Sequence, residues 1–186
     1  ELDHCAANGV KDVVEIKIGF DGIVLVNANV APVFKITRRD LFLALAKLVP
    51  DPAGGRKLVP NPYQTWRDIE PSLPADRIEV LGPPPTSGTR DAFAELVLEP
   101  GCETFRELAA RKKTDAGGFR AVCHAIREDG AYVEAGENDN LIVQKLEANP
   151  GAIGIFGFGV VLAPAIGPVV GGVLVEQFGW RSIARR

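Results

Sequence analysis

Strand-like and helix-like patterns of apolar residues alternate along most of this 186-residue chain. The strand-like runs are short and rich in β-branched residues, whereas the helix-like segments repeat apolar residues every three or four positions. We expect strands at residues 13–27, 77–81, 132–133 and 152–156, and helices at 37–48, 63–69, 87–99, 103–113, 118–128 and 138–148. Such alternation is typical of an α/β sheet flanked by helices.

Local signals sharpen several of these boundaries. Thr37 and Asp40 have the spacing of a capping box at the start of a helix. The pair Pro100-Gly101 is expected to end the helix that opens at Ser87. Residues 23–26 form a continuous apolar run, which predicts a strand buried on both faces.

Composition and charge limit the classes of protein to consider. The chain is 46% hydrophobic and 24% charged, a balance that suits a folded globular protein. Its net charge of -3 offers no basic excess, so nucleic acid is not an expected partner, and any anion must be held by a local group of residues. The chain starts at Glu1 and contains no methionine, so we expect a processed or truncated polypeptide.

The strongest candidate for chemistry is the run Gly-Pro-Pro-Pro-Thr-Ser-Gly-Thr-Arg at residues 82–90. A strand followed by a tight turn and a helix start aims several backbone N–H groups at one point, where the helix dipole favours an anion. Ser87 and Thr89 add hydroxyl donors, and Gly88 lets an oxyanion approach the backbone closely. Arg90 adds a planar fork that can hold two oxygens together.

Arg90 is the residue that separates two interpretations of this loop. A cation in the first helical turn opposes the helix dipole by roughly 0.3–1 kcal/mol, and a bound anion or a partner carboxylate would remove that conflict. The plainer alternative is an ordinary serine N-cap at Ser87, with Arg90 paired to Asp91 or solvated. Both interpretations stay open on the residues alone.

The three cysteines and two histidines indicate no metal or catalytic centre. Cys102 and Cys123 lie on neighbouring expected helices and match no zinc pattern. They form either a loop-closing disulfide in an oxidising compartment or two buried thiols, and Cys5 is left over. No Ser-His-Asp or Cys-His arrangement is evident. We therefore expect no catalytic residue, no metal and no cofactor, and a protein that is not an enzyme.

Five segments occur in the order found in one family of transport proteins. They are residues 18–27, 37–48, 65–69, the run Ser-Gly-Thr-Arg-Asp-Ala-Phe at 87–93 and the run Asn-Pro-Gly-Ala-Ile-Gly at 149–154. From Val14 to about Phe158 the chain thus resembles the substrate-binding proteins of phosphate ABC importers, with the N-terminal part of the family missing. Prolines occupy the region where some members carry an arginine ahead of the Ser-Gly-Thr run.

The resemblance implies a fold, a function and a site. The fold would be a periplasmic binding protein-like (type II) α/β lobe, with a mixed sheet flanked by helices. Ser87, Gly88 and Thr89 would bind inorganic phosphate, with Arg90 supplying charge. The protein would act without catalysis as a periplasmic receptor whose partner is the membrane permease of an ABC importer. The expected parts are a first-lobe remnant with crossing strands (1–27), the second lobe (28–150), a returning strand (151–158) and an apolar tail (159–186).

The tail does not fit this family. No charged residue occurs from Ala148 to Val175, a length that suits a transmembrane candidate. Residues 159–181 resemble the fifth-helix motif of major facilitator superfamily drug/proton antiporters. The alternatives are therefore a fused C-terminal apolar helix that contacts a membrane through residues 159–180, a fragment of a membrane exporter, or a non-functional chimera joined near Phe158-Gly159.

Overall fold

The computed structural model describes residues 5, 7–10, 19–31, 35–55, 57–136 and 139–161. The chain divides into two compact units. One comprises Glu1–Gly22 with Phe158–Arg186, and the other comprises Ile23–Gly157. The second unit contains most of the described helices and strands.

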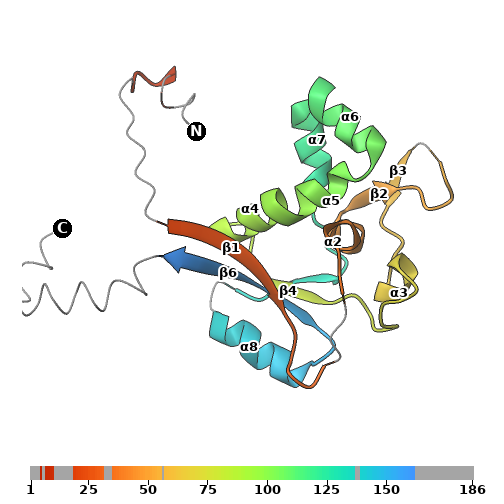
Figure 1. The fold of residues 1–186 in the computed structure, drawn as a ribbon, viewed down its shortest axis with the longest axis vertical. Helices are drawn as coiled ribbons and strands as arrows, with labels where there is room; N and C mark the ends of the chain where they lie inside the picture. The colour runs from red at the N-terminus through yellow and green to blue at the C-terminus, as the bar shows by residue number, and fades with distance from the viewer. Residues whose placement is uncertain are drawn as a thin grey trace, which may run out of the picture. The chain divides into compact units, whose positions relative to one another are not determined.

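A four-stranded mixed sheet organises the second unit, with strand order β1-β6-β4-β5. The strands are β1 (Gly19–Val26), β4 (Val80–Gly82), β5 (Tyr132–Glu134) and β6 (Ile153–Val161). β4 is parallel to β5 and to β6, since Val80 pairs with both Tyr132 and Ile153. β1 and β6 run in opposite directions (Figure 1). The expected mixed α/β fold is therefore confirmed.

Helices cover both faces of this sheet (Figure 1). α8 (Asp139–Ala148) packs against one face, where Leu81 joins a buried cluster with Ile142 and Leu146. The other face carries α2 (Arg38–Leu45) and the helical run α4 (Gly88–Phe93), η1 (Ala94–Leu98) and α5 (Glu99–Glu103). Val80 belongs to the buried cluster on that face, because neighbouring strand residues point to opposite sides.

A second cluster joins the remaining elements to α2. These are the antiparallel pair β2 (Leu48–Pro50) and β3 (Leu58–Pro60), with α6 (Arg106–Thr114) and α7 (Ala116–Cys123). Phe42, Cys102 and Phe119 lie at its centre and are almost fully buried. The short helix α3 (Trp66–Ile69) places Trp66 in the sheet-side core instead.

The predicted helix start at Thr37 is confirmed and the predicted helix end at Pro100-Gly101 is wrong. The Thr37 hydroxyl accepts from the Asp40 N–H, and the Asp40 carboxylate accepts from the Thr37 N–H, as a capping box requires. The helical run passes through Pro100 to Glu103, because Pro100 stands in the first turn of α5, directly after the wide π-helical turn of η1. Gly101 is needed for close packing: a Cβ there would lie 2.9 Å from Phe42 Cβ.

The burial predicted for residues 23–26 is also wrong. β1 stands at the end of the order of the described strands, and its successive side chains point to opposite faces of the sheet. Val24 and Val26 are 38% and 37% exposed, while Ile23 and Leu25 pack against the core. The continuous apolar run therefore forms a strand that is buried on one face only.

The C-terminal tail lies largely outside the described residues. β6 extends to Val161, and residues 162–186, which hold most of the antiporter-like motif, are not described. Among the residues that are described, no helix has the length and apolar character to cross a membrane.

Candidate functional site

The loop from Pro83 to Ser87 lies at the carboxyl ends of parallel strands. β4 ends at Gly82, which pairs with Glu134 at the end of β5, and β6 runs parallel on the other side of β4. In open α/β sheets, ligands bind at this edge of the strands. The fold therefore places the predicted loop at the edge where a binding site is expected.

Ser87 begins α4 as its N-cap. Its backbone is extended, its Oγ accepts from the Thr89 N–H at 3.3 Å, and its carbonyl accepts from the Arg90 N–H at 3.0 Å. The Ser87 N–H in turn donates to the Pro84 carbonyl at 3.0 Å, which closes a tight turn. These bonds occupy the N–H groups of Ser87, Thr89 and Arg90, whereas the Gly88 N–H has no partner among the described contacts.

Gly88 and Thr89 form the outer surface of this helix start. Gly88 is exposed, and no atom of the described residues lies within 4 Å of the position where a side chain would begin. Thr89 is partly covered because β6 passes close by: a Cβ on Gly157 would lie 2.8 Å from the Thr89 hydroxyl oxygen. The loop is thus accessible at Gly88, whereas β6 packs against it at Thr89.

The Arg90 side chain folds back over the strand ends. Its Nη1 donates to the Pro83 carbonyl at 3.3 Å, and its guanidinium carbon lies 4.4 Å from the ring centre of Tyr132. The same Nη1 is 4.0 Å from a Glu134 carboxylate oxygen. Glu134 is 55% exposed, so this ion pair contributes roughly 1 kcal/mol or less.

Arg90 is therefore neither paired with Asp91 nor solvated, the two arrangements suggested for a plain N-cap. With only 17% of its side chain exposed, it is largely covered rather than solvated, and its ion-pair partner is Glu134 rather than Asp91. Glu134 supplies part of the negative charge that offsets the cation's position in the first turn. The guanidinium remains at the edge of the sheet, next to the loop.

Tyr132 connects β5 to the loop. Its hydroxyl donates to the Pro83 carbonyl at 2.6 Å and its ring is buried. Burial raises the pKa of the Tyr132 hydroxyl, although the nearby Arg90 charge opposes the shift. The phenol therefore stays protonated and able to donate at neutral pH.

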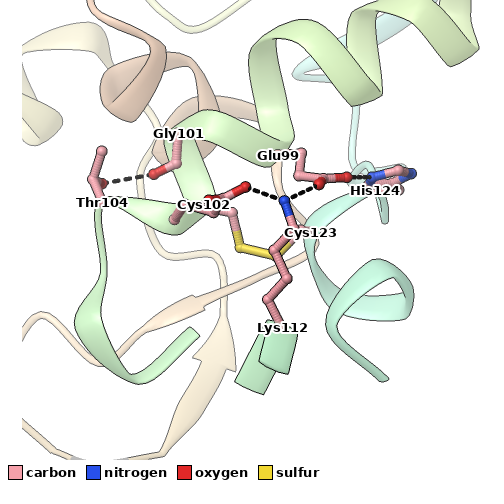
Figure 2. The surroundings of a disulfide bond; sticks show 8 residues. Glu99, Gly101, Cys102, Thr104, Lys112, Cys123 and His124 are labelled. Carbon is pink, nitrogen blue, oxygen red and sulfur yellow. Dashed lines mark hydrogen bonds and ion pairs between the residues drawn. A yellow bond between two sulfur atoms is a disulfide. The ribbon is translucent and has the colours of Figure 1, made fainter. Parts of the chain in front are cut away.

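The Cys102–Cys123 disulfide is formed, which settles the choice left open by the sequence (Figure 2). It links the end of α5 to the end of α7. Glu99 lies beside it and accepts from Lys112 at 2.7 Å, with the His124 ring nitrogen 2.8 Å from its other oxygen. Burial raises the pKa of Glu99, but hydrogen bonds from Lys112 and His124 outweigh that effect and the pKa lies below its usual value. Cys5 is a free thiol.

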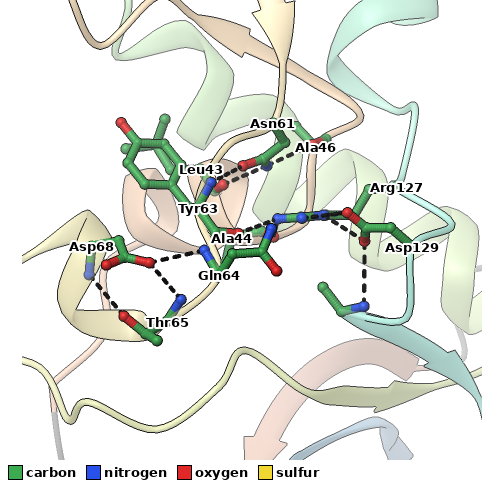
Figure 3. Close-up of polar contacts among 11 residues, drawn as sticks. Leu43, Ala44, Ala46, Asn61, Tyr63, Gln64, Thr65, Asp68, Arg127 and Asp129 are labelled. Carbon is green, nitrogen blue, oxygen red and sulfur yellow. Dashed lines mark hydrogen bonds and ion pairs between the residues drawn. The ribbon is translucent and has the colours of Figure 1, made fainter.

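A second polar network, built around Arg127, was missed by the sequence reasoning (Figure 3). Arg127 is 4% exposed, yet it pairs with Asp129 and donates to the Tyr63 carbonyl at 2.7 Å. Nearby, the Asn61 amide donates to two carbonyls at the end of α2 at 2.7 and 2.8 Å. These contacts join β3, α2 and the segment ahead of β5. The partners lie up to 83 residues apart, so no local pattern marks them.

Elsewhere in the described part of the chain, no cluster of side chains suggests a second binding site for an anion or a metal ion. No group of three or more His, Cys, Asp or Glu side chains in the described part of the chain could hold a metal ion. Surface cavities of about 410, 470 and 370 Å³ are lined by residues elsewhere in the fold, none of them from the Ser87 loop. The open loop, with Arg90 behind it, is the arrangement best suited to hold a small anion.

Comparison with known proteins connects most of the chain to one superfamily. The family described as "PBP superfamily domain" matches residues 1–169. The chain is 28% identical over 158 residues to Protein SphX of Synechococcus elongatus, an alignment that covers 85% of this chain and 36% of that protein. It is 25% identical over 145 residues to the phosphate-binding protein PstS of Staphylococcus saprophyticus, covering 77% of this chain and 32% of that protein.

Two solved structures are also similar. One is a possible phosphate binding protein from Planctomyces limnophilus, with 20% identity, a TM-score of 0.45 and coverage of 84% of this chain and 42% of that one. The other is PstS from Borrelia burgdorferi, with 17% identity, a TM-score of 0.47 and coverage of 83% and 46%. The chain spans about a third of the length of the curated relatives it matches.

Proposed function

The chain belongs to the PBP superfamily, and we propose that it binds inorganic phosphate, without catalysis, at the loop that opens α4. The observation that carries this proposal is the position of Ser87, Gly88 and Thr89 at the carboxyl edge of parallel strands, with Arg90 beside them. The phosphate-binding relative supports the choice of phosphate among small anions.

Each residue of the loop has a distinct role in this proposal. Among the described contacts the Gly88 N–H is the one at the start of α4 without a partner, and it faces the anion together with the positive end of the helix dipole. Gly88 leaves room for an oxygen to approach the main chain. The Ser87 and Thr89 hydroxyls donate to further oxygens, since each hydroxyl can donate one hydrogen while it accepts another. Arg90 adds a fixed positive charge near the same point.

The chain would be part of a larger receptor. We propose that residues 28–150 form the second lobe, that residues 1–27 and 151–158 carry the strands connecting to a first lobe, and that 159–186 form a separate tail. Two lobes of this kind enclose a ligand by rotating about the connecting strands. Delivery to the membrane permease of an ABC importer, from the periplasm, completes the proposed role.

Isothermal titration calorimetry with phosphate, sulfate and molybdate tests this proposal. We expect the 186-residue chain to bind phosphate, and Arg90→Ala to weaken binding by about ten- to a hundredfold, because hydrogen bonds and charge contacts with ionised groups are worth about 1.5–3 kcal/mol. Arg120→Ala, which removes an exposed arginine from α7, is the matched control and should bind as the parent does. Absence of heat with all three oxyanions would contradict the proposal.

A further inference from the structure

The Pro83 carbonyl accepts two hydrogen bonds from different parts of the fold. The Tyr132 hydroxyl reaches it from β5 at 2.6 Å, and Arg90 Nη1 reaches it from α4 at 3.3 Å. Pro83 is the first residue after β4 and is itself buried. This one oxygen therefore joins the strand end, the neighbouring strand and the helix that follows.

We propose that Tyr132 is a positioning residue of the anion site, holding both the start of the Pro83–Ser87 loop and the guanidinium of Arg90 in place. The inference rests on the proposed function and adds a residue that would not itself touch the anion. Its hydroxyl anchors the loop, while its ring supports the guanidinium at 4.4 Å.

The loop transmits this anchoring to Ser87 because it has few free torsions. Pro83, Pro84 and Pro85 each have a φ angle fixed by the ring. The Ser87 N–H is bonded to the Pro84 carbonyl at 3.0 Å, only one residue beyond the anchored carbonyl. Binding groups must be held within about 0.5 Å of their productive geometry. Loss of the anchor at Pro83 should therefore displace Ser87 and, with it, the Gly88 N–H that faces the anion.

The same contact sets the direction of Arg90. The bond of its guanidinium to the Pro83 carbonyl and its ion pair with Glu134 both use Nη1. A guanidinium carries five N–H donors in a rigid fork, so a fork fixed by one nitrogen still presents donors from the others. The cation–π contact with Tyr132 keeps that fork at the edge of the sheet instead of in open solvent.

Gly82 provides independent evidence that the fold makes room for this hydroxyl. A Cβ at Gly82 would overlap the Tyr132 hydroxyl and would lie 2.7 Å from the ring carbon that bears it. Gly82 has no positive φ that would require glycine. The missing side chain is thus explained by the approach of Tyr132, and Gly82→Ala should displace the hydroxyl without removing it.

Two measurements on Tyr132→Phe and Gly82→Ala test the inference. The first is amide hydrogen exchange of Ser87 and Thr89, by NMR without ligand, and the second is phosphate affinity by calorimetry. Removing a buried hydrogen bond should accelerate exchange at both amides and weaken phosphate binding, each by about tenfold. Tyr63→Phe, the same chemical change at the only other tyrosine, should alter neither. Urea unfolding of each variant separates these effects from a general loss of stability.

A double-mutant cycle adds a readout that general destabilisation would not change. If Tyr132 and Arg90 act through the same carbonyl, the effects of Tyr132→Phe and Arg90→Lys on phosphate affinity should be clearly non-additive. Parent-like exchange at Ser87 in Tyr132→Phe would overturn the inference, as would parent-like phosphate affinity. A parent chain that binds no phosphate would contradict the proposed function, while the exchange rates would still decide whether Tyr132 holds the loop.

Discussion

Reduction of the Cys102–Cys123 disulfide should destabilise the protein strongly, even though it removes no apolar contact. The bond ties the end of α5 to the end of α7, with the whole of α6 inside the closed loop. Both cysteines are fully buried in the cluster around Phe42 and Phe119, where two thiols would still fit as small apolar groups. Reduction therefore acts chiefly by restoring conformational freedom to the unfolded chain.

The expected loss follows from the size of the loop. With a sequence separation of 21 residues, the chain-entropy relation gives an entropy of about 11 cal/mol/K, or about 3 kcal/mol at 25 °C. A domain is typically stable by about 5–15 kcal/mol, so this loss is a large fraction of the total. With a denaturant slope of about 2 kcal/mol/M, the urea midpoint should fall by about 1.5 M.

Urea unfolding followed by tryptophan fluorescence, with and without a phosphine reductant, measures this shift. The Cys5→Ser background removes the free thiol from the comparison. A Cys102→Ala/Cys123→Ala double variant should show no response to reductant, which controls for effects of the reductant elsewhere. Equal midpoints for oxidised and reduced protein would refute the entropic argument, and alkylation of all three thiols under oxidising conditions would refute the disulfide itself.

Two further predictions concern the loop and the Arg127 network. Gly157→Ala should weaken phosphate binding several-fold in calorimetry, because its Cβ would lie 2.8 Å from the Thr89 hydroxyl oxygen; Gly151→Ala, where the nearest side-chain atom is 3.7 Å away, should not. Hydrogen bonds from Arg127 lower the pKa of Asp129, so its contribution to stability should be present at neutral pH and lost as pH falls below its ordinary value of 3.8. Urea midpoints measured against pH should show a shallower acid limb in Asp129→Asn, and an unchanged limb would contradict the assignment.

Signals that act over a few residues were the ones that could be predicted from the sequence. The capping box of Thr37 and Asp40 and the N-cap at Ser87 depend on side chains bonding to backbone two or three residues away. The alternation of strands and helices gave the α/β class for a similar reason, since the period of the apolar residues reflects the geometry of each element. The loop of the candidate site was identified on this basis.

Other features depended on which strands become neighbours. Tyr132 is 49 residues from the carbonyl it binds, and nothing in its own surroundings along the chain marks it as part of the loop's support. Gly157 meets Thr89 only because β6 lies beside β4. Val24 is exposed because it points to the face opposite Ile23 and Leu25, and an apolar run cannot reveal which face the rest of the fold covers.

The sequence by itself therefore determined the α/β class, the helix starts at Thr37 and Ser87, and the residue types able to meet an anion. The tertiary structure decided how those residues are held: Arg90 against Tyr132 and Glu134, the Pro83 carbonyl between two donors, and Cys102 bonded to Cys123. The physical reason is one of range. Capping and periodicity are enforced within a turn or two of backbone, whereas the partners of a side chain depend on strand order and packing across the whole fold.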